Sequence, residues 1–233
     1  MMLRTEKLCA WYGAAQILFD VSFAVGPGEV VALMGRNGAG KTTTMKAIMG
    51  LVGRRAGSVR FDGTELLGLK TFQIARLGLG WVPEDRRIFT ELTVLENLDV
   101  GRRAANGATA WTPERLFALF PNLAEMRGRL GGRMSGGEQQ MLTVARTLMG
   151  NPRLVLLDEP SEGVAPLVVE RIAQAIIEMK QLGLSVLLSE QNLYFAALVS
   201  DRVYILEKGH LSWSGDMREL EASPDVQRQF LGV

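Results

Sequence analysis

The sequence has little cysteine and little histidine, and each shortage is informative. Its 233 residues include a single cysteine, Cys9, so no disulfide can form within the chain. A reducing compartment is the simplest setting for such a chain. We expect Cys9 to be an inert residue in a buried strand. The single histidine, His210, follows Lys208-Gly209, and this position predicts an exposed turn residue.

Long apolar runs and an excess of charge are also missing. Runs such as Leu154–Leu157 and Val186–Leu188 are far too short to cross a bilayer. The N-terminal MMLRTEKL has no apolar stretch of signal-peptide length. The formal net charge is +1, whereas nucleic-acid-binding domains usually carry a basic excess. We therefore expect a soluble or peripheral protein with no nucleic-acid partner, which reaches a membrane only through another subunit.

The composition supports a large folded domain. Apolar residues make up 47% of the chain, which excludes a disordered chain and allows a large core. Strands and helices alternate after about residue 150, and this alternation predicts a parallel sheet covered by helices. We expect one domain over residues 1–233, with an α/β core from about 1–85 and 150–233 and a helical subdomain inserted at 86–149.

Several elements can be placed within this plan. The first eighty or so residues predict short strands, and Val30–Met34 is a continuous apolar run typical of a buried strand. The middle region is predicted to be helical, with a polar break at Arg102–Ala110 and a helix start at Thr112-Pro113. Pro166 opens a helix whose apolar face ends at Leu182.

A glycine-rich loop carries the clearest functional signal. Gly35-Arg36-Asn37-Gly38-Ala39-Gly40-Lys41-Thr42 matches GxxxxGK[ST] in full, between an apolar strand and a helix. Glycines let backbone N–H groups point at phosphate oxygens, and the helix N-terminus adds positive charge. Lys41 is expected to reach the β- and γ-phosphates, and Thr42 to ligate Mg²⁺. A chain of this length would match this pattern by chance about one time in a hundred. We therefore predict that Gly35–Thr43 binds MgATP.

Two carboxylates follow a buried strand further along the chain. Leu154–Leu157 ends in Asp158 and Glu159, and a strand end beside a phosphate loop is where Mg²⁺ takes an acidic ligand. We assign that role to Asp158, and to Glu159 the orientation and deprotonation of the attacking water. The alternative, a pair of solvated acids, is disfavoured because the phosphate loop is present.

A third motif begins a helix. Ser135 and Glu138 have the spacing of a capping box, and Gly136 and Gly137 lie between them. Two glycines in the first turn cost roughly 1 kcal/mol each in helix propensity. A capped helix alone does not explain that cost, whereas bare N–H groups that approach an anion do.

These motifs, in this order and spacing, resemble those of the ATP-binding cassette (ABC) family. Gly35–Thr43 corresponds to its Walker A motif, Leu154–Glu159 to Walker B and Met134–Gln140 to the signature, while Thr93–Leu98 resembles its helical subdomain. The resemblance covers essentially the whole chain. It implies an α/β P-loop ATPase core with a parallel sheet, an N-terminal antiparallel β-subdomain and an inserted helical subdomain.

The resemblance also implies an assembly. Two such subunits form a head-to-tail sandwich, and each ATP lies between one Walker A motif and the signature of the other subunit. Ser135, Gly136 and Gly137 would then bind the γ-phosphate of the partner's nucleotide. Tyr12 would stack on adenine, although a surface aromatic at a strand end is the simpler alternative.

Three positions depart from the general ABC pattern. Glu84 stands where glutamine is usual, Ala165 where aspartate is usual, and Gln191 where the switch histidine is usual. Gln191 can hydrogen-bond a γ-phosphate or a water but cannot carry the charge of a histidine, and we expect it to act in turnover by hydrogen bonding alone. Glu84 either accepts from a Mg²⁺-bound water or pairs with Arg86 or Arg87.

The departures resemble one subfamily, the second ATPase subunit of branched-chain amino acid importers. The matching segments are Pro83–Arg87, Ser161–Pro166, Glu190–Asn192 and Gln229–Gly232. Importers of urea and short-chain amides share much of this pattern. The resemblance implies ATP hydrolysis that drives import through a membrane permease supplied by a solute-binding protein. It places the chain at the cytoplasmic face of the inner membrane, paired with a copy of itself or a sister ATPase.

Two other functions compete with transport. A non-transport ABC ATPase acting on ribosomes or DNA usually has two cassettes or a long coiled-coil insertion, and this chain has neither. A P-loop kinase of small molecules has no use for the signature Ser135–Gln140.

Overall fold

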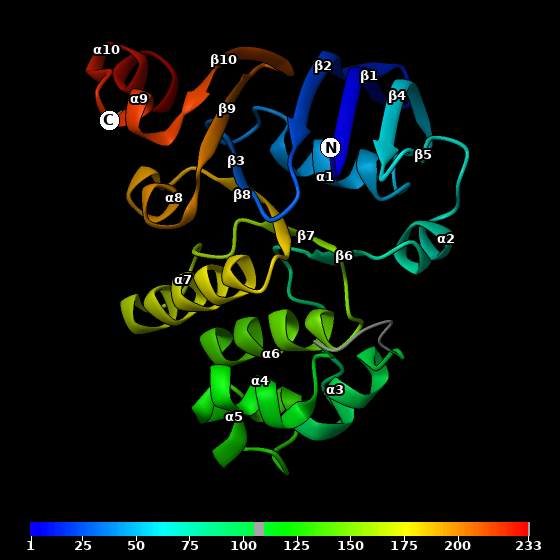
Figure 1. Cartoon of the computed structure of the whole chain (residues 1–233), viewed down its shortest axis with the longest axis vertical. Coiled ribbons are helices and arrows are strands. Elements are labelled where there is room, and N and C mark those ends of the chain that lie inside the picture. Colours follow the sequence, from blue (N-terminus) through cyan, green and yellow to red (C-terminus); the bar gives the residue numbers. More distant parts are fainter. Residues whose placement is uncertain (105–109, 233) are drawn as a thin grey trace.

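The computed structural model describes residues 1–104 and 110–232. Two β-sheets lie side by side in the upper half of Figure 1. The first is antiparallel, with strand order β2-β1-β4-β5. Its strands are β1 (Leu3–Tyr12), β2 (Ala15–Val25), β4 (Arg54–Phe61) and β5 (Thr64–Glu65).

The second sheet is mostly parallel. Its strand order is β10-β9-β3-β8-β7-β6, and only β10 runs antiparallel to its neighbour. The strands are β3 (Val30–Met34), β6 (Leu79–Val82), β7 (Leu154–Asp158), β8 (Ser185–Glu190), β9 (Arg202–Glu207) and β10 (His210–Asp216). Every residue of β3, β7 and β8 is buried, because a central parallel strand is covered on both faces.

Helices cover the parallel sheet and build a separate layer below it (Figure 1). They are α1 (Lys41–Ile48), α2 (Thr71–Arg76), α3 (Val94–Gly101), α4 (Pro113–Leu119), α5 (Pro121–Glu125), α6 (Gly136–Leu148), α7 (Pro166–Gln181), α8 (Leu193–Val199), α9 (Met217–Glu221) and α10 (Pro224–Val226). A 3₁₀ turn at Gly131–Arg133 precedes α6, and a π turn at Gln227–Leu231 follows α10. Within the described residues no helix is long and apolar enough to span a membrane.

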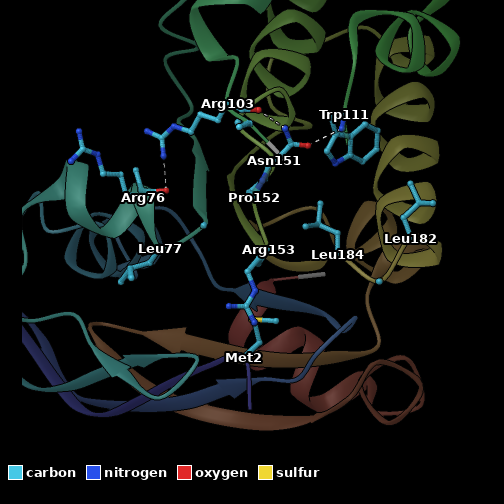
Figure 2. A pocket seen from close by; sticks show the side chains of 15 residues that line it. Met2, Arg76, Leu77, Arg103, Trp111, Asn151, Pro152, Arg153, Leu182 and Leu184 are labelled. Atoms are coloured by element: carbon cyan, nitrogen blue, oxygen red, sulfur yellow. Dashed lines mark hydrogen bonds between the residues drawn. The ribbon is translucent and has the colours of Figure 1, made fainter. Parts of the chain in front are cut away.

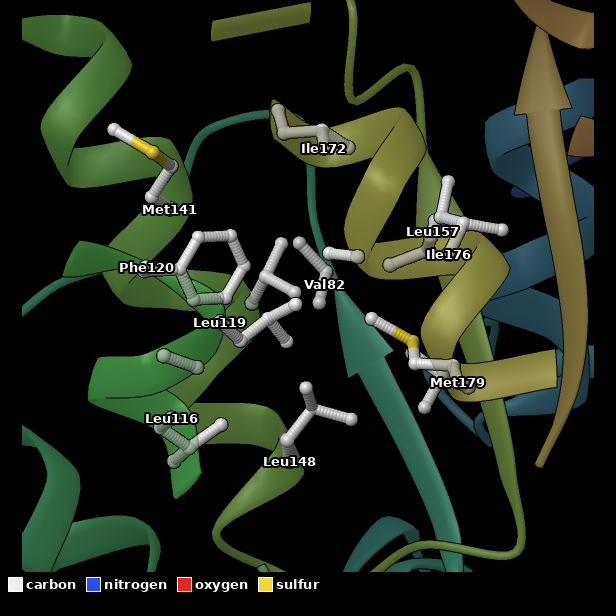
Figure 3. Packing of buried hydrophobic residues seen from close by; sticks show 14 of the residues in the cluster. Val82, Leu116, Leu119, Phe120, Met141, Leu148, Leu157, Ile172, Ile176 and Met179 are labelled. Atoms are coloured by element: carbon white, nitrogen blue, oxygen red, sulfur yellow. The ribbon is translucent and has the colours of Figure 1, made fainter. Parts of the chain in front are cut away.

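One hydrophobic cluster joins the helical layer to the sheet. Figure 3 shows Phe120 of that layer pointing toward Val82 of β6, with Ile176 of α7 beside Leu157 of β7. Residues of β7 alternate between this cluster and a second one that also contains residues of the antiparallel sheet and α1. The strand therefore has to be apolar throughout, and its carboxyl end is held rigidly between two cores.

Most predicted elements are confirmed, some with different bounds. Val30–Met34 is the strand predicted, and Thr112 caps a helix with proline at its first position. Of the polar break predicted at Arg102–Ala110, residues 105–109 lie outside the described residues. The helical region starts later than expected, because residues 86–93 form a loop before α3.

Some expectations near the N-terminus and in α7 were wrong. The first two strands are not short, since β1 has 10 residues and β2 has 11. Register shifts interrupt the pairing between them, and such bulges bend a strand and increase its twist. Cys9 is only half-buried and contacts Asp20 instead of lying in the core. Leu182 follows α7 as its C-cap and is 37% exposed, so the buried face ends at Met179.

His210 is exposed, as expected, but it is not a turn residue. It begins β10, and its ring stacks on Phe19 of β2 with ring centroids 4.6 Å apart. The histidine therefore packs across the junction of the two sheets.

Candidate active site

The phosphate loop connects the central strand β3 to α1. Gly35 has φ 148°, and a Cβ there would lie 2.3 Å from the carbonyl oxygen of Leu206, so only glycine fits. Gly38 has φ 79°, and nothing lies within 4 Å of where its Cβ would be. The first glycine thus packs the loop against β9, while the second leaves open space above the loop.

A cavity of about 440 Å³ opens above this loop. It is lined by Ile17, Asn37, Gly38, Ala39, Gly40, Lys41, Thr42, Thr43, Glu84, Glu159 and Glu162. Most of the predicted phosphate-loop residues therefore meet the predicted catalytic carboxylate Glu159 in one place. Tyr12, Arg36 and the signature residues are not among those lining it.

Lys41 is buried at the floor of this cavity and is fully satisfied. Its Nζ donates to the carbonyl oxygens of Gly35 at 2.7 Å and Arg36 at 3.2 Å, and pairs with Glu159 Oε1 at 3.0 Å. An ammonium has three donors, and all three are used. A phosphate oxygen that binds Lys41 must therefore replace one of these acceptors. Glu159 is the acceptor that can move away, because it is a side chain and the other two are backbone carbonyl oxygens.

Asp158 has the environment that a metal ligand needs. Its Oδ1 accepts from Thr42 Oγ1 at 3.0 Å and from Ser189 Oγ at 2.9 Å. Its Oδ2 is buried and has no hydrogen-bond partner among the described residues. Burial raises the pKa of Asp158, the two hydroxyl hydrogen bonds oppose this, and the charges of Glu159 and Glu84 add to the rise. A cation beside Oδ2 would relieve both the unpaired oxygen and the charge repulsion.

These donors fit Mg²⁺ held together with a nucleotide. Mg²⁺ usually takes one or two protein oxygens plus substrate phosphates and waters, and Thr42 and Asp158 supply the protein share. The described residues contain no cluster of three or more acidic, histidine or cysteine side chains that could hold a metal by itself.

Glu159 is held at both of its carboxylate oxygens. Oε1 pairs with Lys41, and Oε2 accepts from Gln191 Nε2 at 3.3 Å. Burial favours a higher pKa for Glu159, but hydrogen bonds with Glu162 and Lys41, together with the Lys41 charge, bring it below its usual value. Glu159 is therefore ionised and able to accept a proton.

Glu162 is a neighbour of Glu159 that the sequence motifs did not single out. Its Oε2 accepts from the same Gln191 nitrogen at 3.4 Å. The hydrogen bond with Glu159, followed by burial and the negative charges of Glu159, Glu84 and Glu190, raises the pKa of Glu162 to about 7. Near neutral pH the proton of the pair is therefore held by Glu162, while Glu159 stays ionised, because two close carboxylates do not readily ionise together.

Glu84 lies on the Asp158 side of the site. It lines the cavity above the phosphate loop and also a smaller one of about 220 Å³ that includes Thr42 and Asp158. Among the described residues Glu84 forms no ion pair with Arg86 or Arg87, and Arg87 pairs with Asp85 at 2.9 Å. Its contact with a metal-bound water stays a prediction, and the competing arginine pairing is absent.

The signature forms the start of α6, as predicted. Ser135 caps the helix, and Glu138 Oε2 accepts from the Ser135 backbone N–H at 2.6 Å, which completes the capping box. The two glycines also have a packing reason that the sequence did not reveal. A Cβ at Gly136 would lie 2.5 Å from Arg86 Nη1, and one at Gly137 would lie 2.6 Å from Val168 Cγ2.

Tyr12 stands at the end of β1 and is 47% exposed. It does not line the cavity, whereas Ile17 of β2 does. Its stacking on adenine therefore stays a prediction.

Ile17, Glu162, Ser189 and Glu190 are the site residues that sequence reasoning missed. Ser189 and Glu190 end β8, which pairs in parallel with β7, and Ser189 lies opposite Asp158. The carboxyl ends of neighbouring parallel strands meet at one edge, so the polar end of the Leu184–Leu188 run was the available signal.

A second cavity, of about 360 Å³, lies at the other edge of the sheet (Figure 2). It is lined by Gly78, Pro152 and Leu184, which precede β6, β7 and β8, and by Trp111 and Arg103. Trp111 N donates to Asn151 Oδ1 at 2.7 Å, and Asn151 Nδ2 donates to the Arg103 carbonyl at 2.9 Å. Ligands of open α/β sheets bind at the carboxyl ends of strands, so this cavity is separate from the site above the phosphate loop.

The sequence matches known proteins over its whole length. The family model described as ABC transporter matches residues 18–162. The chain belongs to the ABC transporter family. Its members hydrolyse ATP, and this ABC protein has the parallel sheet and the phosphate loop of such an ATPase.

Similar proteins serve more than one kind of transport. The high-affinity branched-chain amino acid transport ATP-binding protein BraG of Pseudomonas aeruginosa is 41% identical over 99% of this chain and 100% of its own length. A probable branched-chain amino acid transport ATP-binding protein, LivF of Archaeoglobus fulgidus, is 34% identical over 100% of this chain and 99% of its own. The lipopolysaccharide export system ATP-binding protein LptB of Escherichia coli is 35% identical over 99% of this chain and 97% of its own.

Solved structures agree with the fold. A nucleotide-free ATP-binding cassette from an ABC transporter superposes with a TM-score of 0.81 at 27% identity, covering 97% of this chain and 96% of that one. An ATP-binding subunit of another ABC transporter gives 0.82 at 31% identity, covering 98% and 93%. The expected α/β P-loop fold, with its antiparallel N-terminal sheet and helical region, is confirmed.

Proposed function

We propose that this ABC protein is the ATPase subunit of an importer for branched-chain amino acids. The observation that carries this proposal is the full-length similarity to BraG at 41% identity, together with Glu84, Ala165 and Gln191 at the positions where the subfamily departs from the general pattern. Import of urea or short-chain amides is the closest alternative. Lipopolysaccharide export is another, because LptB matches at 35%.

The roles of the site residues follow from their contacts. Lys41 and the N–H groups of the phosphate loop bind the triphosphate, and Thr42 and Asp158 hold Mg²⁺. When bound, Mg²⁺ neutralises the charge that develops on the phosphate oxygens. Glu159 accepts the proton of the attacking water, and Gln191 orients Glu159 through its amide.

Two partners complete this function. A second ABC ATPase subunit supplies its signature to the cavity above the phosphate loop, because the cavity in one chain has no signature residue in its lining. A membrane permease docks near the loop that precedes α3. There a shallow cavity of about 370 Å³ is lined in part by Trp81, Phe89 and Val100, and Phe89 and Val100 are 47% and 55% exposed. We infer from the similarity to transporter subunits that the chain lies at the cytoplasmic face of the membrane.

Reconstitution tests the proposal directly. The chain is co-purified from its native host with its membrane subunits, which are identified, and ATP hydrolysis is measured in liposomes. Leucine with its binding protein should stimulate hydrolysis several-fold, while urea, acetamide or lipopolysaccharide should not. Stimulation by one of the latter, without stimulation by leucine, contradicts the branched-chain assignment and identifies the solute class instead.

A further inference from the structure

Glu190 has no role in the chemistry assigned above, yet it is buried and hydrogen-bonded to three backbone groups. It ends β8 and is 1% exposed. Its Oε1 accepts from the N–H of Ser161 at 3.2 Å, and its Oε2 from the N–H groups of Gln191 and Asn192 at 3.1 Å each. A buried carboxylate is costly unless it is paired in this way.

These three N–H groups belong to two separate loops. Ser161 lies in the loop after β7, next to Glu162, whereas Gln191 and Asn192 lie between β8 and α8. A single carboxylate therefore holds the backbone beside Glu162 at a fixed distance from the backbone of Gln191. The same carboxylate keeps the Gln191 loop in place at the start of α8, where Asn192 caps the helix.

The side chains carried by these two loops converge on Glu159. The Gln191 amide nitrogen lies 3.3 Å from Glu159 Oε2 and 3.4 Å from Glu162 Oε2, so it bridges both carboxyl groups. Glu162 also hydrogen-bonds Glu159, so each of these three side chains contacts the other two. This hydrogen bond raises the pKa of Glu162 to about 7. Lys41 holds the other oxygen of Glu159.

We propose that Glu190 is a positioning residue for ATP hydrolysis, which acts through Glu162 and Gln191 on the direction of the Glu159 carboxylate. A phosphate that binds Lys41 takes the cation with which Glu159 now pairs. Glu162 and Gln191 are then the contacts that aim Glu159 at the attacking water. A misplacement of about 1 Å in a catalytic group can cost on the order of 100-fold in rate. The proposal rests on ATP hydrolysis and not on the transported solute.

The first test is Glu190→Gln in the full-length chain. The amide has nearly the same shape, but it replaces one acceptor oxygen by a donor, so one of the three N–H groups loses its partner. Steady-state ATP hydrolysis should show kcat lower by about 10-fold or more, within the range expected for a misplaced base. KM should stay within about twofold, because the phosphate-loop contacts are unchanged. Circular dichroism and thermal melting establish that the variant is folded.

The second test is Glu162→Ala, a change at an exposed side chain that does not threaten folding. It should give the same fall in kcat. The double variant Glu162→Ala/Glu190→Gln should lose no more than the larger single effect, because both residues act on one target. If Glu190→Gln does not fold, Glu162→Ala decides the question.

Glu65→Gln is the matched control. Glu65 Oε1 also accepts from three backbone N–H groups, those of Val59 at 2.9 Å and of Leu66 and Leu67 at 3.1 Å each, but in the antiparallel sheet. Its kcat should equal that of the parent. A parent-like kcat in folded Glu190→Gln or in Glu162→Ala overturns the proposal. So does a double variant in which the two falls in kcat multiply. An equal fall in kcat in Glu65→Gln overturns it as well. A parent chain without any ATP turnover overturns hydrolysis itself, whereas a wrong solute assignment leaves all of these comparisons intact.

Discussion

At the scale of single residues, the contact between Lys41 and Glu159 pairs the two buried charges of the site. Both side chains are almost fully buried, and they neutralise each other at 3.0 Å. A buried ion pair adds little net stability, but loss of one partner is costly. If Glu159 and Lys41 have the roles proposed for them, the pair leaves neither charge unpaired before nucleotide binds.

Gln191 should affect turnover without affecting nucleotide affinity. Its amide contacts Glu159 and Glu162, and it is not among the residues that line the cavity above the phosphate loop. We expect Gln191→Ala to lower kcat by about 10-fold and to leave KM for ATP nearly unchanged, because only the positioning of Glu159 is lost. Steady-state ATP hydrolysis measures both constants.

Gln227→Ala is a matched control for this substitution. Gln227 also donates to two acceptors, the carbonyl oxygens of Leu220 and Glu221, but in the C-terminal segment. It should hydrolyse ATP at the parent rate. If Gln191→Ala also turned over ATP at that rate, a role for Gln191 in hydrolysis would be refuted.

Glu162 should give the stability a specific pH dependence. The pKa of Glu162 is raised to about 7 in the folded chain, above the unfolded value near 4.5. Its stabilising contribution is therefore complete below about pH 4.5 and is lost as the pH rises through 7. Glu162→Gln removes this dependence, so the melting temperature of the variant minus that of the parent should rise between pH 5 and pH 8. Thermal melts at both pH values decide this, and an unchanged difference would mean that Glu162 is not protonated in the folded state.

The sequence alone could identify those site residues that lie within one contiguous motif. Lys41 and Thr42 follow from one contiguous pattern, and Asp158 and Glu159 from the end of one apolar strand. Ser189 and Glu190 become site residues only because β7 and β8 pair in parallel with Asp158 opposite Ser189. That register depends on packing of the whole sheet, so no single segment of sequence reveals it. Glu162 is brought back to Glu159 by a local turn, in which its N–H donates to the Glu159 carbonyl oxygen.

At the scale of elements, the start of α6 shows how one short segment meets two demands. Ser135 and Glu138 cap the helix, which any helix of this length could use. Gly136 and Gly137 were interpreted from sequence as bare N–H groups for an anion, whereas the structure also places Arg86 and Val168 against them. Packing against Val168 accounts for Gly137, anion binding stays the prediction for both glycines, and a mutation can separate the two causes.

Gly137→Ala should destabilise the fold through Val168. The new Cβ would lie 2.6 Å from Val168 Cγ2, and valine is stiff at χ1 and cannot turn away cheaply. Overpacking of this kind costs about 1–3 kcal/mol, which corresponds to a fall in melting temperature of roughly 2–12 °C for a domain of this size. Thermal melting by circular dichroism measures the change.

Val168→Ala is the background that isolates the cause. In that background Gly137→Ala should be neutral or slightly stabilising, because alanine favours helix over glycine by up to about 1 kcal/mol. A loss of stability that persists would show that Val168 is not the reason for glycine at this position. If stability returns but ATP hydrolysis does not, the glycine also serves nucleotide binding.

Element bounds were predictable where hydrophobic pattern and caps coincide. Val30–Met34 carries the hydrophobic pattern alone, whereas the capped starts of α3, α4 and α6 carry both signals. The long strands β1 and β2 carry neither, because polar residues and register shifts interrupt their alternation. They are strands because they pair with each other and with β4, which is a tertiary effect that local propensity does not encode.

At the scale of the whole molecule, the site in one chain is incomplete. The cavity above the phosphate loop has Glu84, Glu159 and Glu162 along its lining and a single lysine at its floor. A triphosphate placed there needs further donors on its open side. The signature in the head-to-tail arrangement provides such donors at the N-terminus of α6, which is why we propose a sandwich of two subunits.

ATP should drive the formation of that sandwich. Glu159→Gln removes the base while it keeps a similar shape, so the ATP-bound state should persist, and sedimentation velocity with MgATP should show a dimer. The measurement is made on the chain alone and with the sister subunit of its native complex.

Adding Ser135→Asp keeps the N-cap, because aspartate caps as well as serine, but it places a carboxylate against the partner's γ-phosphate. This double variant should remain monomeric with ATP bound. Thr112→Asp in the Glu159→Gln background makes the same exchange at the cap of α4 and should still dimerise. A chain that binds ATP but stays monomeric in every case, or one in which Ser135→Asp leaves the dimer intact, would show that the signature does not complete the site across the subunit boundary.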